Sequence, residues 1–159
     1  MNNNGKTGKH QISATAVIPA RRERVYALIA NYNEGHPRIV PKEFSDLVVE
    51  QGGVGAGTVI RFQMTLLGKK QTCRAAITEP EPGRVLVETD LETNGAVTTF
   101  TVDQGNAPAD SRVTISTMLP VRSGFLGLLE RGLSTLLLRP IYRKELQNLA
   151  RVATGPFAL

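Results

Sequence analysis

The hydrophobic pattern of the chain changes its period at Ser123, and this change constrains the fold most strongly. Before it, apolar and polar residues alternate along short segments, as in half-buried strands. After it, leucines recur at helical spacing over 123–153, which predicts one long helix with Ser123 as its N-cap. Pro140 predicts a kink in this helix, and Gly155 predicts its end. A sheet with an apolar face needs a cover, and this helix is the element large enough to provide it.

The segment before Ser123 reads as one strand, a short helix and a series of strands. The pattern predicts a strand over 11–19, a helix over 20–31 and a loop over 31–41, with a helical turn near 41–44. Six further strands follow, separated by Gly-, Asn- and Pro-containing turns: 46–50, 58–67, 71–78, 84–91, 96–102 and 112–119. The fold class expected is therefore α+β, with an antiparallel sheet of about seven strands gripping one long C-terminal helix.

A chain of 159 residues fits one domain. We expect a disordered polar tail over 1–9, a single domain over 10–154 and a short tail over 155–159. The single cysteine excludes an internal disulfide, and two histidines exclude a three-histidine metal site. We therefore expect neither a metal nor a cofactor. The polar first nine residues lack the apolar core of a signal peptide, which favours a cytoplasmic location.

The net charge of +5 is concentrated at the two ends of the chain. Residues 1–24 carry five basic residues and one acidic residue, and residues 121–159 carry six basic and two acidic. Peripheral contact with an anionic membrane or a ribosome is one interpretation, and solvated surfaces are the simpler and favoured one. Aromatic residues are few and tryptophan is absent, so DNA binding is not expected. The oligomeric state stays open.

Many residues predicted on the inner face of the sheet are small. Glycines at 127 and 132 also thin the helix that should cover this face. The pattern fits a cavity for an apolar ligand and fits tight packing of helix on sheet equally well. The small inner-face residues are Ala14, Ala16, Cys73, Ala75, Thr89, Thr98 and Thr117.

The chain resembles the START-like (SRPBCC) helix-grip superfamily, which includes polyketide cyclase/dehydrase and lipid-transfer-like proteins. The residues that carry the likeness are ISATAVIPARRERVYALIANY, GVGAGTVIRFQM, EPEPGRVLVET, VTISTM and LLLRPIYRKELQNLARVA, spread over about 11–154. The resemblance implies a pocket under the long helix and an aromatic residue partway along the first helix, here Tyr26. It is specific for fold rather than function, and no cyclase motif is recognisable, so no catalytic residue is carried over.

The predicted function is binding of a small hydrophobic or amphipathic ligand, such as a lipid, quinone or polyketide, between the sheet and the long helix. The walls are expected to come from Phe62, Met64, Phe100, Leu129, Leu133 and Leu136. Tyr32 and His36 are the polar candidates near the mouth. The alternatives are a polyketide cyclase or dehydratase, and an interaction module at a membrane or ribosome.

The remaining titratable residues favour structural interpretations. His36 reads as a surface-loop histidine with Glu34 nearby. The pattern places Val85, Val87, Thr89 and Leu91 inward and the carboxylates Glu88, Asp90 and Glu92 in solvent. Cys73 reads as a small buried hydrophobe. The cations around Pro140 either hold a ligand headgroup or form a solvated helix face: Arg139, Arg143 and Lys144.

Overall fold

The computed structural model describes residues 8–93 and 95–156, and it confirms the expected α+β helix-grip fold. Within these residues, seven strands, two α-helices and one short 3-10 helix follow one another along the chain. Their bounds are β1 Gly8–Ile18, α1 Arg22–Ala30, η1 His36–Arg38, β2 Phe44–Gln51, β3 Val59–Leu66, β4 Lys69–Glu81, β5 Val85–Asp90, β6 Val97–Gln104, β7 Ser111–Val121 and α2 Gly124–Thr154.

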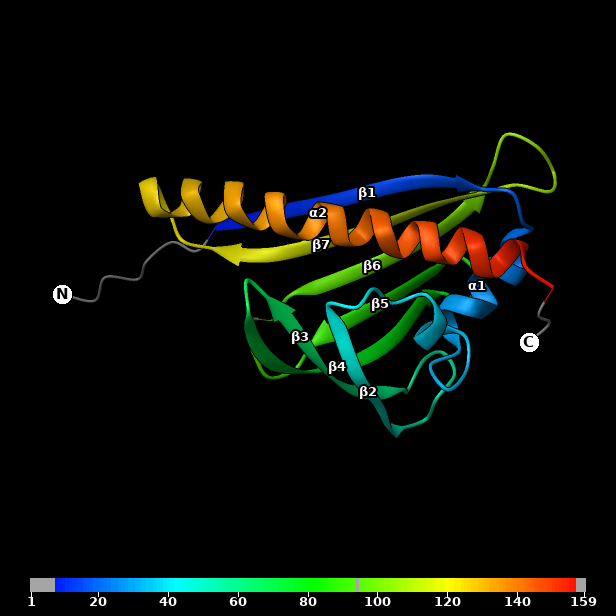
Figure 1. Ribbon diagram of the computed structural model, residues 1–159, viewed down its shortest axis with the longest axis horizontal. Coiled ribbons are helices and arrows are strands. Elements are labelled where there is room, and N and C mark those ends of the chain that lie inside the picture. Colours follow the sequence, from blue (N-terminus) through cyan, green and yellow to red (C-terminus); the bar gives the residue numbers. More distant parts are fainter. Residues whose placement is uncertain (1–7, 94, 157–159) are drawn as a thin grey trace.

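The strands form one antiparallel sheet in the order β1-β7-β6-β5-β4-β3-β2. The first strand pairs with the last, while β2 to β7 form a meander in which each strand pairs with the next. Helix α2 runs lengthwise across one face of this sheet, and α1 lies at the end where α2 finishes (Figure 1). Alternation along each strand decides which side chains reach α2; in β1, Ile12, Ala14 and Ile18 are buried.

The core lies between the sheet, α1 and the second half of α2. From α2, Leu146 and Leu149 are almost fully buried and belong to one cluster with Leu86 and Ile115 of the sheet. Burying each such side chain contributes about 1.5–3 kcal/mol. This end of the molecule is therefore closed by packing, and the space for a ligand lies further along the sheet.

Two local expectations need correction. Strand β1 begins at Gly8, so residues 8 and 9 pair with β7 instead of belonging to a tail; residues 1–7 and 157–159 lie outside the described part. The helical turn expected near 41–44 is found at His36–Arg38, where Pro37 supplies a φ suited to the first turn. The expected bounds of the long helix are confirmed: Ser123 is the N-cap of α2, although its side chain makes no capping hydrogen bond, Pro140 lies inside the helix and Gly155 is the C-cap.

No helix in residues 8–93 and 95–156 is both long and apolar enough to cross a membrane.

Candidate functional site

A cavity of about 300 Å³ lies between the inner face of the sheet, η1 and the middle of α2. This volume is at the small end of the range for ligand pockets. The walls are mainly apolar, with Ile60, Phe62 and Met64 from β3, Phe100 from β6 and Leu138 from α2. A molecule in this space would gain most of its binding energy from apolar burial.

The polar side of the cavity centres on Glu88 of β5. The Tyr32 hydroxyl donates to Glu88 Oε1 over 2.5 Å, and His36 Nε2 lies 3.7 Å from the same oxygen. The Tyr32 and His36 rings are stacked with centroids 4.4 Å apart, and His36 meets Phe100 edge-on at 5.7 Å. Burial, followed by the Glu88 charge, raises the pKa of Tyr32 well above its ordinary value. Tyr32 therefore stays protonated and acts as a donor to Glu88.

His36 is held by backbone contacts of the loop after α1. Its Nδ1 lies 2.8 Å from the Ile29 carbonyl, and because a carbonyl accepts only, Nδ1 carries the hydrogen. Gly35 lets the loop press against α1, since a Cβ there would lie 2.5 Å from the Leu28 carbonyl oxygen. His36 Nε2 is thereby aimed at Glu88.

Glu145 places a second carboxyl group at the cavity. It lines the cavity from α2, is 4% exposed, and receives no hydrogen bond from residues 8–93 and 95–156. Burial raises the pKa of Glu145 well above its ordinary value, and the charge of Glu88 adds to this shift. The protonated form of Glu145, which presents an O–H donor to the cavity, therefore persists to higher pH than that of an exposed glutamate.

A chain of hydroxyl groups joins α2 to the sheet beside Glu145. Tyr142 Oη lies 2.5 Å from Thr117 Oγ1, which in turn lies 2.8 Å from Thr98 Oγ1. Burial raises the pKa of Tyr142 to about 12, so its hydroxyl is neutral at physiological pH. All three residues line the cavity, and their hydroxyls add polar contacts without adding charge.

The structure brings together part of the predicted site. His36, Phe62, Met64 and Phe100 line the cavity, and Tyr32 lies behind His36 with its hydroxyl on Glu88. The prediction is wrong for the wall residues expected from α2, because the face of α2 that meets the cavity carries Ser134, Leu138 and Tyr142. The predicted residues lie on the outer face of α2 and are 55%, 51% and 72% exposed: Leu129, Leu133 and Leu136.

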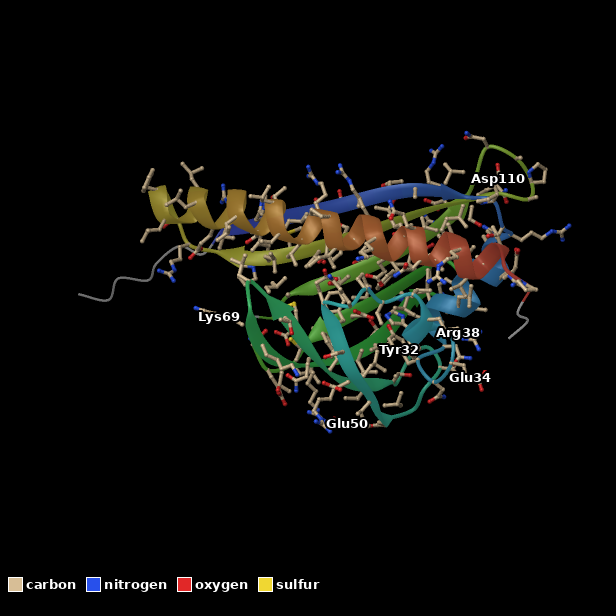
Figure 2. The ribbon with its side chains drawn as sticks, in the orientation of Figure 1. Tyr32, Glu34, Arg38, Glu50, Lys69 and Asp110 are labelled. Atoms are coloured by element: carbon tan, nitrogen blue, oxygen red, sulfur yellow. The ribbon has the colours of Figure 1, made fainter. Side chains whose placement is uncertain are left out.

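Two interpretations of charged residues are also wrong. His36 is 3% exposed instead of lying on a surface loop, and its carboxylate neighbour is Glu88, while Glu34 is exposed at the rim of the molecule (Figure 2). In β5 the inward face carries fully buried Leu86 with Glu88 and Asp90, so the assignment of faces was inverted. Val87 and Thr89, on the opposite face, are only half-buried.

The other candidates keep structural interpretations. Cys73 is buried on the cavity wall, and burial raises the pKa of its thiol, which disfavours a nucleophilic thiolate. Arg139 is half-buried, Arg143 and Lys144 are exposed, and none of these cations is among the cavity residues. Within the described ranges, no group of three His, Cys, Asp or Glu side chains is arranged to hold a metal ion.

Sequence reasoning missed Glu145 and the inward direction of Glu88. A signal for Glu145 was present, because it lies three and four residues from the buried Tyr142, Ile141 and Leu149. A carboxyl group inside an otherwise apolar helical stripe is a departure from amphipathic pattern.

The arrangement defines a class of protein: a helix-grip domain whose sheet and long helix enclose an apolar cavity with an acidic polar side. Comparison with protein families sharpens this class. The model of the family "Polyketide cyclase / dehydrase and lipid transport" matches residues 9–154, so the chain belongs to that family. Comparison with curated proteins finds no match.

Solved structures share the fold over nearly the whole chain. The KanY protein (ms6282) is 26% identical, with a TM-score of 0.80, covering 93% of this chain and 99% of its own. Zhui aromatase/cyclase from Streptomyces sp. R1128 is 13% identical, with a TM-score of 0.74 and coverages of 92% and 94%. Norcoclaurine synthase from Thalictrum flavum, in truncated form, is 13% identical, with a TM-score of 0.76 and coverages of 98% and 100%. The latter two likenesses show the fold alone.

Proposed function

We propose that this protein binds a small hydrophobic or amphipathic molecule in the cavity between the sheet and α2. The observation that supports it most is a cavity of about 300 Å³ whose walls are mainly apolar and whose polar groups are gathered around Glu88 and Glu145. Apolar walls supply affinity and a few polar groups fix orientation, as in ligand pockets generally. Membership of a family described by lipid transport and polyketide chemistry agrees with this class of ligand.

The test compares two alanines on opposite faces of β4. Ala75 lines the cavity, and Ala76 is its neighbour on the outer face. Ala75→Leu fills part of the cavity and should weaken binding of the fluorescent probe isopropylnaphthalene at least about 10-fold, a loss of about 1.4 kcal/mol. Ala76→Leu should leave binding unchanged. Equal affinities in the two variants, or no binding by the unaltered protein, would overturn the proposal.

A second candidate function is acid–base catalysis on the bound molecule. It is favoured by two carboxyl groups at one cavity in different surroundings: Glu88 accepts a hydrogen bond from Tyr32, and burial raises the pKa of Glu145 well above its ordinary value. Such a pair can take a proton from the carbon next to a carbonyl and donate a hydrogen bond to the carbonyl oxygen. Two of the solved structures with this fold are an aromatase/cyclase and norcoclaurine synthase.

This candidate can be tested with acetylnaphthalene in deuterium oxide. Glu88 would break a methyl C–H bond and take the proton, and return of a deuteron to the enol would label the methyl group. Nuclear magnetic resonance should show labelling faster than in buffer, and Glu88→Gln should abolish the excess. Labelling at the buffer rate would count against enolisation in this cavity.

A further inference from the structure

The first inference concerns the polar group of the ligand, and it rests on the proposed binding function. Glu145 is 4% exposed, lines the cavity and has no hydrogen-bond partner among the described residues. A buried polar group without a partner is costly to the folded state. In a cavity that admits a ligand, such a group marks the place where the ligand supplies the missing partner.

We propose that Glu145 is the specificity-determining residue of the cavity, donating a hydrogen bond from its neutral carboxyl group to an oxygen acceptor on an otherwise apolar ligand. A carbonyl or quinone oxygen is the class of acceptor that fits.

The groups that face Glu145 argue for a neutral acceptor rather than an anion. Across the cavity lies Glu88, and beside it lies Tyr142, whose hydroxyl is already bonded to Thr117. The Tyr32 hydroxyl is already bonded to Glu88, and His36 Nε2 lies 3.7 Å from the same carboxyl oxygen. At the more distant wall, the carboxylate of Asp90 accepts hydrogen bonds from the backbone N–H groups of residues 92, 93 and 95, and Arg74 is paired with Glu50 at 2.6 Å. An anionic ligand group near Glu145 would meet the carboxyls of Glu145 and Glu88, and the one arginine among the described residues lining the cavity, Arg74, is already paired.

A neutral acceptor also suits the raised pKa of Glu145 beside Glu88. Burial and the Glu88 charge raise the pKa of Glu145 and so favour its protonated form, which can donate a hydrogen bond to a ligand. A cationic amine would favour the ionised carboxylate and would have to displace that proton. The proposal therefore predicts preference for a ketone over a matched amine.

Three naphthalene probes of similar size separate these possibilities: acetylnaphthalene, isopropylnaphthalene and naphthylethylamine. The chain has no tryptophan, so naphthalene fluorescence can be followed directly. The protein should bind the ketone about 10-fold more tightly than the hydrocarbon at mildly acidic pH. That preference should fall as the pH rises through the raised pKa of Glu145, because the ionised carboxylate no longer donates.

Variants at Glu145 complete the test. Glu145→Leu should abolish the preference while keeping affinity for isopropylnaphthalene, which also shows that the cavity has kept its shape. Glu145→Gln retains a donor and should keep part of the preference. Equal ketone preference in Glu145→Leu, or tightest binding of the amine, would overturn this inference alone. No binding of any probe would overturn the proposed function with it.

A second, independent observation concerns the outer face of α2, which points away from the cavity. The apolar side chains exposed in the first half of the helix are Phe125, Leu126, Leu128, Leu129, Leu133 and Leu136, between 51% and 74% exposed. At 3.6 residues per turn they fall within about 160° of the circumference. An exposed apolar surface of this kind marks an interaction site.

The charges along the same face indicate what covers it. At helical spacing Arg143, Lys144 and Arg151 continue the stripe in the second half of α2, and all three are exposed. They form no ion pair with residues in 8–93 and 95–156. A symmetric contact with a second copy would bury this apolar stripe beside unpaired cations of both copies, whereas an anionic bilayer would pair them.

We infer that this outer face of α2 docks on an anionic lipid surface, with the apolar side chains in the interface and the three cations at the headgroups. Vesicles of phosphatidylcholine, alone or mixed with phosphatidylglycerol, provide the test by co-sedimentation. Binding should require phosphatidylglycerol and weaken as salt is added.

Two variants should lose at least about half of the vesicle-bound protein, for different reasons. Leu129→Asp with Leu133→Asp removes apolar insertion, and Arg143→Glu with Lys144→Glu reverses charge. The control is Val54→Asp, at an equally exposed valine in the loop before β3. No sedimentation with anionic vesicles, equal sedimentation of all variants, or a dimer that Leu129→Asp with Leu133→Asp dissociates without any vesicle binding would overturn the inference.

Discussion

The Tyr32 hydroxyl donates to Glu88 Oε1 over 2.5 Å while the Tyr32 ring stacks on His36, so one side chain contacts both Glu88 of β5 and His36 of η1 at the cavity. Tyr32 is 1% exposed and lies in the loop after α1. Together with His36 of η1, it contacts the Glu88 carboxyl group. Removing the hydroxyl leaves a mostly buried carboxylate with one donor fewer.

Tyr32→Phe should therefore lower the free energy of unfolding by about 1–3 kcal/mol, the cost of an unsatisfied buried group. Urea denaturation measures this change. In the Glu88→Gln background the carboxylate is absent, so Tyr32→Phe should cost less there. Additive effects in the double-mutant cycle would show that the two side chains are not coupled.

Glu145 should make stability depend on pH. Its pKa in the folded protein is raised above the ordinary value of 4.5, so the folded state binds the proton more tightly than the unfolded state. Its contribution is fully present below about pH 4.5 and is lost as pH rises toward the raised pKa, at up to about 1.4 kcal/mol per pH unit. Glu145→Gln should remove this loss, so the variant should gain stability relative to the unaltered protein as pH increases. A constant difference from pH 4 to pH 9, in parallel urea titrations, would mean that Glu145 does not titrate in this range.

The sequence predicted the sheet correctly because turns and alternation are local signals. It failed on the face of β5, where Val85, Val87 and Leu91 look more like a core face than Leu86, Glu88 and Asp90 do. Burying Glu88 is unfavourable locally and is offset by Tyr32, which is 56 residues away in the chain. No pattern within β5 contains that information.

The helix α2 shows the same limit in another form. Its first half has leucines on several faces, so spacing does not identify the face that meets the sheet. Tertiary contacts decide it: His10 Nε2 lies 2.7 Å from Thr135 Oγ1, and a Cβ at Gly127 would overlap the Arg122 carbonyl. These contacts turn Ser134 and Leu138 inward and leave Leu129, Leu133 and Leu136 outward.

Gly35 should be essential to the position of His36. A Cβ there would lie 2.5 Å from the Leu28 carbonyl oxygen and 2.9 Å from its Cα, so Gly35→Ala must push the loop off α1. We expect a loss of about 1–3 kcal/mol in the free energy of unfolding. The matched control is Gly132→Ala in α2, where nothing lies within 4 Å of the added Cβ; it should be neutral or stabilising by up to about 1 kcal/mol. If Gly35→Ala were equally harmless, the loop would not be fixed by this contact.

The two faces of α2 should respond differently to the loss of a leucine side chain. Leu138 is 9% exposed, lines the cavity and contacts the core, while Leu136 is 72% exposed two residues earlier. Leu138→Ala should lower the free energy of unfolding by about 2 kcal/mol, near the low end for buried leucines because the space beside it is already a cavity. Leu136→Ala should change stability by no more than about 0.5 kcal/mol, as expected for an exposed position. Thermal and urea unfolding of both variants measure these changes, and a larger loss in Leu136→Ala would show that the outer face of α2 is packed against protein.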